Sequence, residues 1–214
     1  MTLTNTPRLL KGALVAFDLF NPLASVVVFQ YNPDAVTRRL EPRTATSGGD
    51  RSEATRLTGP PKETITLSVE LDATDQLADK NPIATTLGVY PALSALEMML
   101  YPKTALVIAN AVLAAAGTIE LLPASGPMIL LVWGPARVLP VRVASFSITE
   151  EAFDPLLNPI RAKVELSLTV LSYSDLSLLD PSNFIFLAHQ IAKETMATLN
   201  VVNSVQNVAK GLRL

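Results

Sequence analysis

FSITEEAFDPLLNPIRAKVELSLTV, residues 146–170, is the stretch that decides the fold. Its second half alternates between apolar and polar residues, which is typical of a strand with one buried face. The apolar positions are Val164, Leu166, Leu168 and Val170, and the polar ones are Lys163, Glu165, Ser167 and Thr169. Before this run, Asp154-Pro155 and Asn158-Pro159 indicate turns. The stretch therefore predicts two strands joined by a hairpin loop.

Three carboxylates, Glu150, Glu151 and Asp154, fall within a span of five residues at that loop. Paired carboxylates work as acid and base when a buried pocket separates their pKa values. A loop between two strands is usually exposed, so these groups are expected to keep ordinary pKa values. The pattern favours a structural hairpin over an acid/base site.

Other signs of catalysis are equally scarce in the sequence. The motifs GxSxG, GxGxxG and GxxxxGK[ST] do not occur, and His189 is the single histidine. We expect His189 to be a residue of a helix surface or an interface. The sequence predicts no enzyme, and it offers no catalytic, cofactor-binding or metal-binding residue.

Composition points toward self-assembly. The 214 residues include 17 Lys and Arg against 19 Asp and Glu, so a basic face for nucleic acid is not expected. There is no cysteine, which excludes disulfides and thiolate metal sites. Only 17% of the residues are charged, compared with about 25% in an ordinary globular domain. Such a chain is expected to expose apolar patches that contact partners, its own copies first.

The uncharged run TALVIANAVLAAAGTI, residues 104–119, raises the question of a membrane. It falls short of the ~20 residues that cross a bilayer, so a buried or interface segment is the favoured prediction. The apolar run near the N-terminus is broken by Asp18 and makes a poor signal peptide. We expect a soluble protein made in the cytoplasm.

The whole chain is predicted to be a sheet-rich α+β protein. Asp180 and Pro181 suit the N-cap and first turn of a helix that continues to about Lys210. Strands are expected at 26–31, 65–71, 127–133, 141–149 and 163–171, and a short helix at 91–101. Residues 1–175 would form one domain, with an extended loop or arm at 41–61 and an apolar insertion at 103–125. Residues 176–214 would form a C-terminal helical extension.

The order of several pieces also carries a family resemblance. They are FQYNP at 29–33, LTGPPKETITLSVELDATD at 57–75, PALSALEMMLYP at 91–102, LLVWG at 130–134, and the run from 141 to 170 that includes NPIRA. In this order and spacing the chain resembles the tube-fold baseplate proteins of contractile injection systems, of the tube-initiator or hub-adaptor type. It is similar to the N-terminal domain of the relatives that also carry a LysM module.

The resemblance implies a fold like that of phage tail tubes, with two packed sheets closed into a barrel-like sandwich and a helix against it. It also implies a ring of six copies that joins the spike or hub to the inner tube and templates tube assembly. The partners would be the spike, the tube protein and other baseplate proteins, inside a phage-tail-like particle.

Two features depart from the family pattern. The 103–125 run looks longer than the usual link, and the C-terminal tail is too short for a LysM module, so peptidoglycan binding is not transferred.

Two other classes of function stay open. One is a structural protein of the particle that docks on a membrane through 104–119. The other is a small-ligand-binding β-sandwich, which would be expected to have an aromatic cluster, although the chain has one Trp and four Tyr.

Overall fold

A computed structural model describes residues 10–18, 21–44, 56–102, 104–117, 126–177 and 179–211. Its strands are β1 (Ala13–Asp18), β2 (Asn21–Val28), β3 (Val36–Thr44), β4 (Leu57–Asp72), β5 (Met128–Val132), β6 (Val138–Phe153) and β7 (Pro159–Val170). Its helices are α1 (Thr74–Ala78), α2 (Pro82–Leu87), α3 (Tyr90–Glu97), α4 (Thr104–Ala115) and α5 (Pro181–Gly211). The chain is thus α+β, as the sequence predicts.

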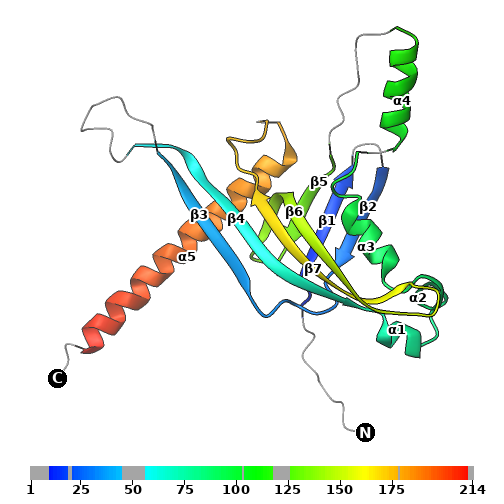
Figure 1. The fold of residues 1–214 in the computed structure, drawn as a ribbon. Helices are drawn as coiled ribbons and strands as arrows, with labels where there is room; N and C mark the ends of the chain where they lie inside the picture. The colour runs from blue at the N-terminus through cyan, green and yellow to red at the C-terminus, as the bar shows by residue number, and fades with distance from the viewer. Residues whose placement is uncertain are drawn as a thin grey trace.

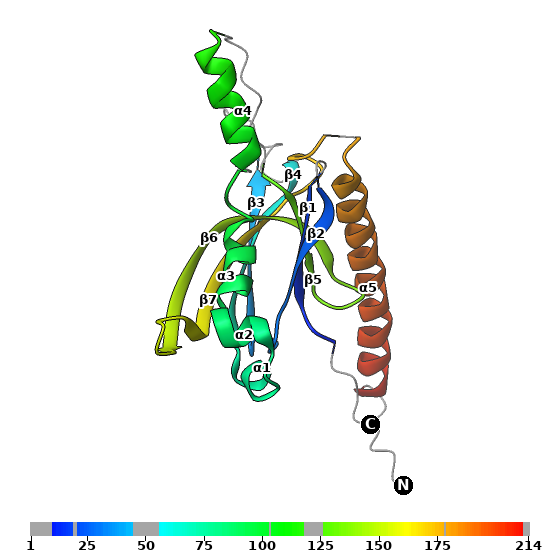
Figure 2. The same ribbon diagram turned by 90° about the vertical axis from the view of Figure 1, so that its right-hand side faces the viewer.

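Within these described ranges, hydrogen bonds join all seven strands into one sheet in the order β2-β1-β5-β6-β7-β4-β3. Every neighbouring pair is antiparallel. In Figure 2, α3 lies on one side of β1 and β5, and α5 lies on the other side. The expected second sheet of a closed sandwich stays a prediction.

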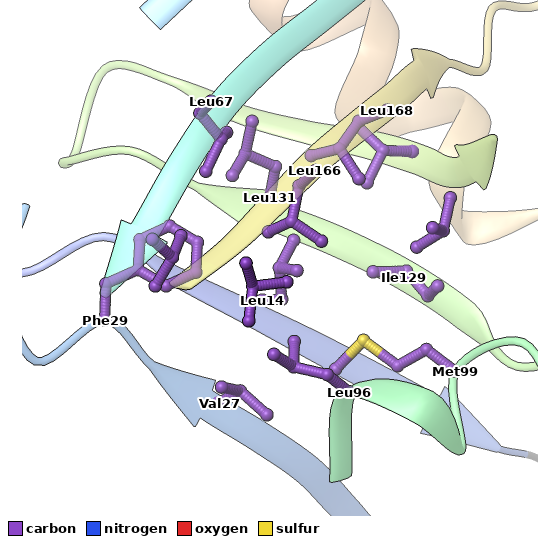
Figure 3. Packing of buried hydrophobic residues seen from close by; sticks show 14 of the residues in the cluster. Leu14, Val27, Phe29, Leu67, Leu96, Met99, Ile129, Leu131, Leu166 and Leu168 are labelled. Atoms are coloured by element: carbon purple, nitrogen blue, oxygen red, sulfur yellow. The ribbon is translucent and has the colours of Figure 1, made fainter. Parts of the chain in front are cut away.

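The core is built from the apolar faces of the alternating strands. Val164, Leu166 and Leu168 of β7 are fully buried, so the face predicted from their alternation is confirmed. Burying one such side chain is worth about 1.5–3 kcal/mol, which outweighs the entropy of fixing its rotamer. Figure 3 shows Leu166 and Leu168 beside Leu14 and Leu131 from the strands β1 and β5.

Two hairpins, β6–β7 and β3–β4, extend further than the sequence pattern predicts. Glu150 and Glu151 belong to β6, where they pair with Ala162 and Arg161, and not to a loop. The range 41–61 is likewise strand at both ends, because β3 continues to Thr44 and β4 begins at Leu57; residues 45–55 lie outside the described ranges. Backbone pairing does not require apolar side chains, so each hairpin extends beyond the core.

The two longest apolar helical segments behave differently. Asp180 caps α5, because its Oδ1 accepts a hydrogen bond from the Ser182 N–H at 2.9 Å, which confirms that part of the prediction. Helix α4 has no buried residue and stands away from the sheet (Figures 1 and 2). Of the two alternatives for this segment, burial in the core therefore does not hold for 104–115, and an interface stays a prediction. Because the run contains no charged residue and only isolated polar ones, its hydropathy alone indicated no face that packs on the sheet.

Candidate functional site

The β6–β7 hairpin ends in a loop that Asp154 organises. Its Oδ1 accepts hydrogen bonds from the backbone N–H groups of Leu156 and Asn158, each at 2.8 Å. Its Oδ2 accepts a bond from the Asn158 side-chain amide at 2.8 Å. These donors, Asn158 first, lower the pKa of Asp154 because they favour the ionised carboxylate. Asp154 is therefore a structural group of the turn.

The other two carboxylates of the hairpin point to no acid/base site. Glu150 and Glu151 are exposed on β6. Arg161, which follows the turn, donates two hydrogen bonds to Asp72 Oδ2 on β4 at 2.9 and 2.7 Å. Asp154 thus lies in the turn, whereas Glu150 and Glu151 lie on strand β6 with exposed side chains.

The position of His189 differs from the sequence prediction. It is 8% exposed and lies on the face of α5 that packs on the sheet, whereas a position on a helix surface or at an interface was expected. Within the described part of the chain, neither ring nitrogen makes a hydrogen bond of regular geometry, although the Ala136 backbone lies close enough to interact with the ring. Burial, followed by the charge of Lys193, lowers the pKa of His189, because both disfavour the imidazolium. Both effects favour the neutral imidazole.

Beside His189 lies a charged cluster that we call the Glu63 cluster: Arg38, Glu63 and Lys193. Glu63, only 4% exposed, accepts a hydrogen bond from Arg38 Nε at 2.6 Å and faces Lys193 Nζ at 3.5 Å. Burial by itself raises the pKa of Glu63, but the bonds and charges of Arg38 and Lys193 outweigh it, so the pKa is lowered. The cluster ties α5 to β3 and β4.

Glu63 was not predicted from the sequence, although the sequence contains a signal for it. Glu63 stands two residues before Ile65 and so continues the buried series Ile65, Leu67 and Val69 on one face of β4. A carboxylate in phase with a core face needs a cation as its partner.

Both edges of the sheet are potential assembly surfaces. Strands β2 and β3 each pair with one neighbour within the described residues, which leaves backbone groups on their outer sides open. On β2, Val26 and Val28 are half exposed, and on β3 Leu40 is half exposed. Edges with apolar side chains favour pairing with another strand.

Two further apolar surfaces lie away from the edges. Leu156 and Leu157 at the tip of the β6–β7 hairpin are 78% and 79% exposed. Helix α4 exposes Val107, Ile108 and Val112.

A cleft of about 570 Å³ lies between β2, the end of β4 and the helices α1–α3. Two of its polar groups are paired internally: the Gln30 side-chain oxygen accepts a bond from the Asp72 N–H, and the Asp72 carboxylate binds Arg161. The lining also contains Lys11, Tyr31, Asp75 and Gln76, so the small-ligand alternative stays open.

Neither metal binding nor membrane crossing has a structural counterpart in the described ranges. No group of three His, Asp or Glu side chains there is placed to hold a metal ion. None of the helices that the structure describes combines the length and the apolar character needed to traverse a bilayer.

A scan against protein-family models and a search of curated proteins find no match to this chain.

Proposed function

We propose that this chain is a structural baseplate component of a contractile injection system, in which copies form a ring between the spike or hub and the inner tube. In this role the ring templates tube assembly, and sheet edges join neighbouring copies, six of them in a closed annulus. The barrel-like sandwich of tail tubes is the finer fold that belongs to this proposal.

The observation that carries the proposal is the pair of open sheet edges, β2 and β3, at the two ends of a single sheet. In a closed ring the β2 edge of one copy meets the β3 edge of the next, and both sets of backbone groups become paired. The low charge content and the exposed Val26, Val28 and Leu40 at these edges support this arrangement. The ordered sequence resemblance to tube-fold baseplate proteins supplies the identity of the ring.

The test is co-expression with a spike and a tube protein, followed by an electron-microscopy reconstruction of the particle. We expect a six-fold annulus of this chain on the central axis between spike and tube. A position off that axis, or a copy number that six-fold or three-fold symmetry cannot produce, would overturn the proposal.

A matched pair of variants isolates the role of the edge. Val28→Lys places a charge on the exposed edge strand β2 and is expected to prevent ring formation. Thr195→Lys, on an exposed part of α5, is the control and is expected to assemble normally. Both variants should melt like the parent chain, because neither position is buried.

A further inference from the structure

The strands β1 and β2 carry an apolar surface that we call the β1–β2 patch: Phe17, Val26 and Val28, which are 42%, 52% and 51% exposed. The opposite face of these strands belongs to the core, where Leu14 and Val27 are buried. Pairing the β2 edge with another strand does not cover the patch, because the side chains of a strand stand perpendicular to the sheet. An apolar sheet face is normally covered by a second layer of structure.

The patch lies on the same side of the sheet as helix α5. Directly paired residues of antiparallel strands share a face, and Phe17 pairs with Met128 of β5. Val26 pairs with Val15, which stands two residues before Phe17 and so on the same face. Met128 Sδ contacts Ser182 Oγ in the first turn of α5. In its own chain α5 packs mainly on β6, two strands away from β1, and the patch stays exposed.

Helix α5 is longer than the surface on which it packs. Phe186 and His189 are buried, and Lys193 faces Glu63 of β4. Every residue from 194 to 201 is exposed. Residues 194–211, which we call the α5 overhang, continue the helix by about 27 Å. A long helical segment thus extends past the sheet of its own chain.

The packing face of α5 continues into the overhang. Met196 follows His189 by seven residues, close to two full turns, so both lie on nearly the same side of the helix. Leu199 follows Met196 by three residues and lies beside it. Met196 and Leu199 are 48% and 60% exposed. The overhang contains only Glu194 and Lys210 as charged residues, whereas helices of the membrane interface carry a basic polar face. A protein surface therefore suits it better than a membrane.

The overhang points toward the position of the next copy in the proposed ring. In Figure 1, α5 crosses behind the sheet and its C-terminal end lies beyond β3, at the edge opposite to β2. In the ring the β3 edge of one copy meets the β2 edge of the next. Rotation about a ring axis does not turn one copy over relative to its neighbour, so α5 lies on the same side in both. The overhang of one copy therefore reaches the β1–β2 patch of the next.

We propose that the α5 overhang of one copy packs across the β1–β2 patch of the adjacent copy. This inference rests on the proposed ring and adds a second contact to its sheet edges. Two paired strand edges bury one row of backbone groups, whereas specific interfaces bury at least roughly 1,200 Å². A helix laid over the joined strands adds apolar area on both copies. Each α5 then covers two sheets, its own at β6 and its neighbour's at β1 and β2.

Because the chain has no cysteine, single introduced cysteines report this contact directly. Met196→Cys and Val26→Cys variants with different tags are co-expressed with the spike and tube proteins and treated with a short bis-maleimide. We expect a mixed cross-link between the two tagged chains. Thr195→Cys replaces Met196→Cys in the control, because Thr195 is also exposed but points about 100° away around the helix. A mixed product no stronger than that control would overturn the inference.

A second measurement tests whether the contact stabilises the assembly. Met196→Lys places a charge against the apolar patch, and we expect it to weaken association of the copies, measured by sedimentation, by roughly tenfold. Thr195→Lys introduces the same charge at the neighbouring position and should change nothing. Both variants should melt like the parent chain, because both positions are exposed. Equal association of the two variants would count against the overhang as a contact.

The outcomes separate this inference from the proposed function. A six-fold annulus without the mixed cross-link retains the ring and rejects packing of the overhang on the patch. A mixed cross-link in the isolated chain, without incorporation into a particle, supports the contact and rejects the baseplate role. Absence of both the annulus and the cross-link rejects both proposals. If Met196→Lys lowers incorporation into the particle but no mixed cross-link forms, the overhang contacts a different protein and the inference is overturned.

Discussion

Of the helices α4 and α5, the more apolar one, α4, is the less buried. Helix α4 is uncharged and apolar, yet it buries none of its side chains. Helix α5 contains Lys193 and Glu194, yet Phe186 and His189 on it are buried against the sheet. The difference shows that apolar composition alone does not make a helix pack on its own sheet. Packing there also requires apolar side chains on one face of the helix and polar groups that pair with those of the sheet.

The largest effect is expected where α5 meets the core. Phe186 is 8% exposed and makes an edge-to-face contact with Tyr173 at 6.0 Å between ring centroids. We expect Phe186→Ala to lower the free energy of unfolding by about 3–5 kcal/mol. Phe184→Ala, two residues earlier and 65% exposed, is the matched control. Equal losses in chemical denaturation would mean that α5 does not dock through this face.

The second effect concerns the Glu63 cluster. Glu63→Gln removes the charge that Arg38 and Lys193 neutralise, and we expect a loss of about 1–3 kcal/mol, since both cations are partly exposed. Glu70→Gln, exposed on the same strand, is the control and should cost little.

The pH dependence of that loss tests its cause. Because the pKa of Glu63 is lowered in the folded state, its contribution is present above the ordinary value of 4.5 and is lost as the pH falls through the folded pKa. The difference between the parent chain and Glu63→Gln should therefore shrink on acidification. A difference that stays constant down to the acid transition would show that the charge is not the cause.

His189 gives a smaller effect in a separate pH window. Its pKa is lowered by folding, so the unfolded chain binds a proton first as the pH falls below the ordinary value of 6.5. The free energy of unfolding should therefore be independent of His189 above that pH. Below it, the free energy of unfolding should decline by at most about 1.4 kcal/mol per pH unit. The decline should be absent in His189→Leu, measured by denaturation between neutral pH and the titration of the carboxylates. A parallel decline in both proteins would contradict a buried neutral imidazole.

Much of the fold follows from patterns that a single chain encodes locally. The alternation around Leu166 gives both the strand and its buried face, because successive side chains of a strand point to opposite sides. Asp180 gives the start of α5, since its carboxylate satisfies a free N–H of the first turn. These features depend only on neighbours in the sequence.

The candidate site depends on contacts between distant residues and was harder to predict. The burial of His189 depends on which side of α5 meets the sheet, and nothing in the adjacent residues specifies it. Glu63 could have been recognised from its phase with Ile65, but its partner Lys193 is 130 residues away. The exposure of α4 was missed because an uncharged run indicates burial in some interface, without indicating which one.

The smallest effect on stability is expected for a substitution on α4, and it tests whether this helix packs on its own chain. Val112→Ser makes the exposed centre of α4 more polar, and we expect the unfolding free energy to change by no more than about 0.5 kcal/mol. Val164→Ser, at a fully buried position of β7, is the contrasting variant and should be strongly destabilised. The measurement is chemical denaturation of the isolated chain at low concentration, where contacts between copies are absent. A loss at Val112 approaching that at Val164 would mean that α4 packs on its own chain in solution, and the contrast between the two helices would then disappear. If the Val112→Ser chain keeps its free energy of unfolding but no longer enters the particle, the partner of α4 lies outside its own chain.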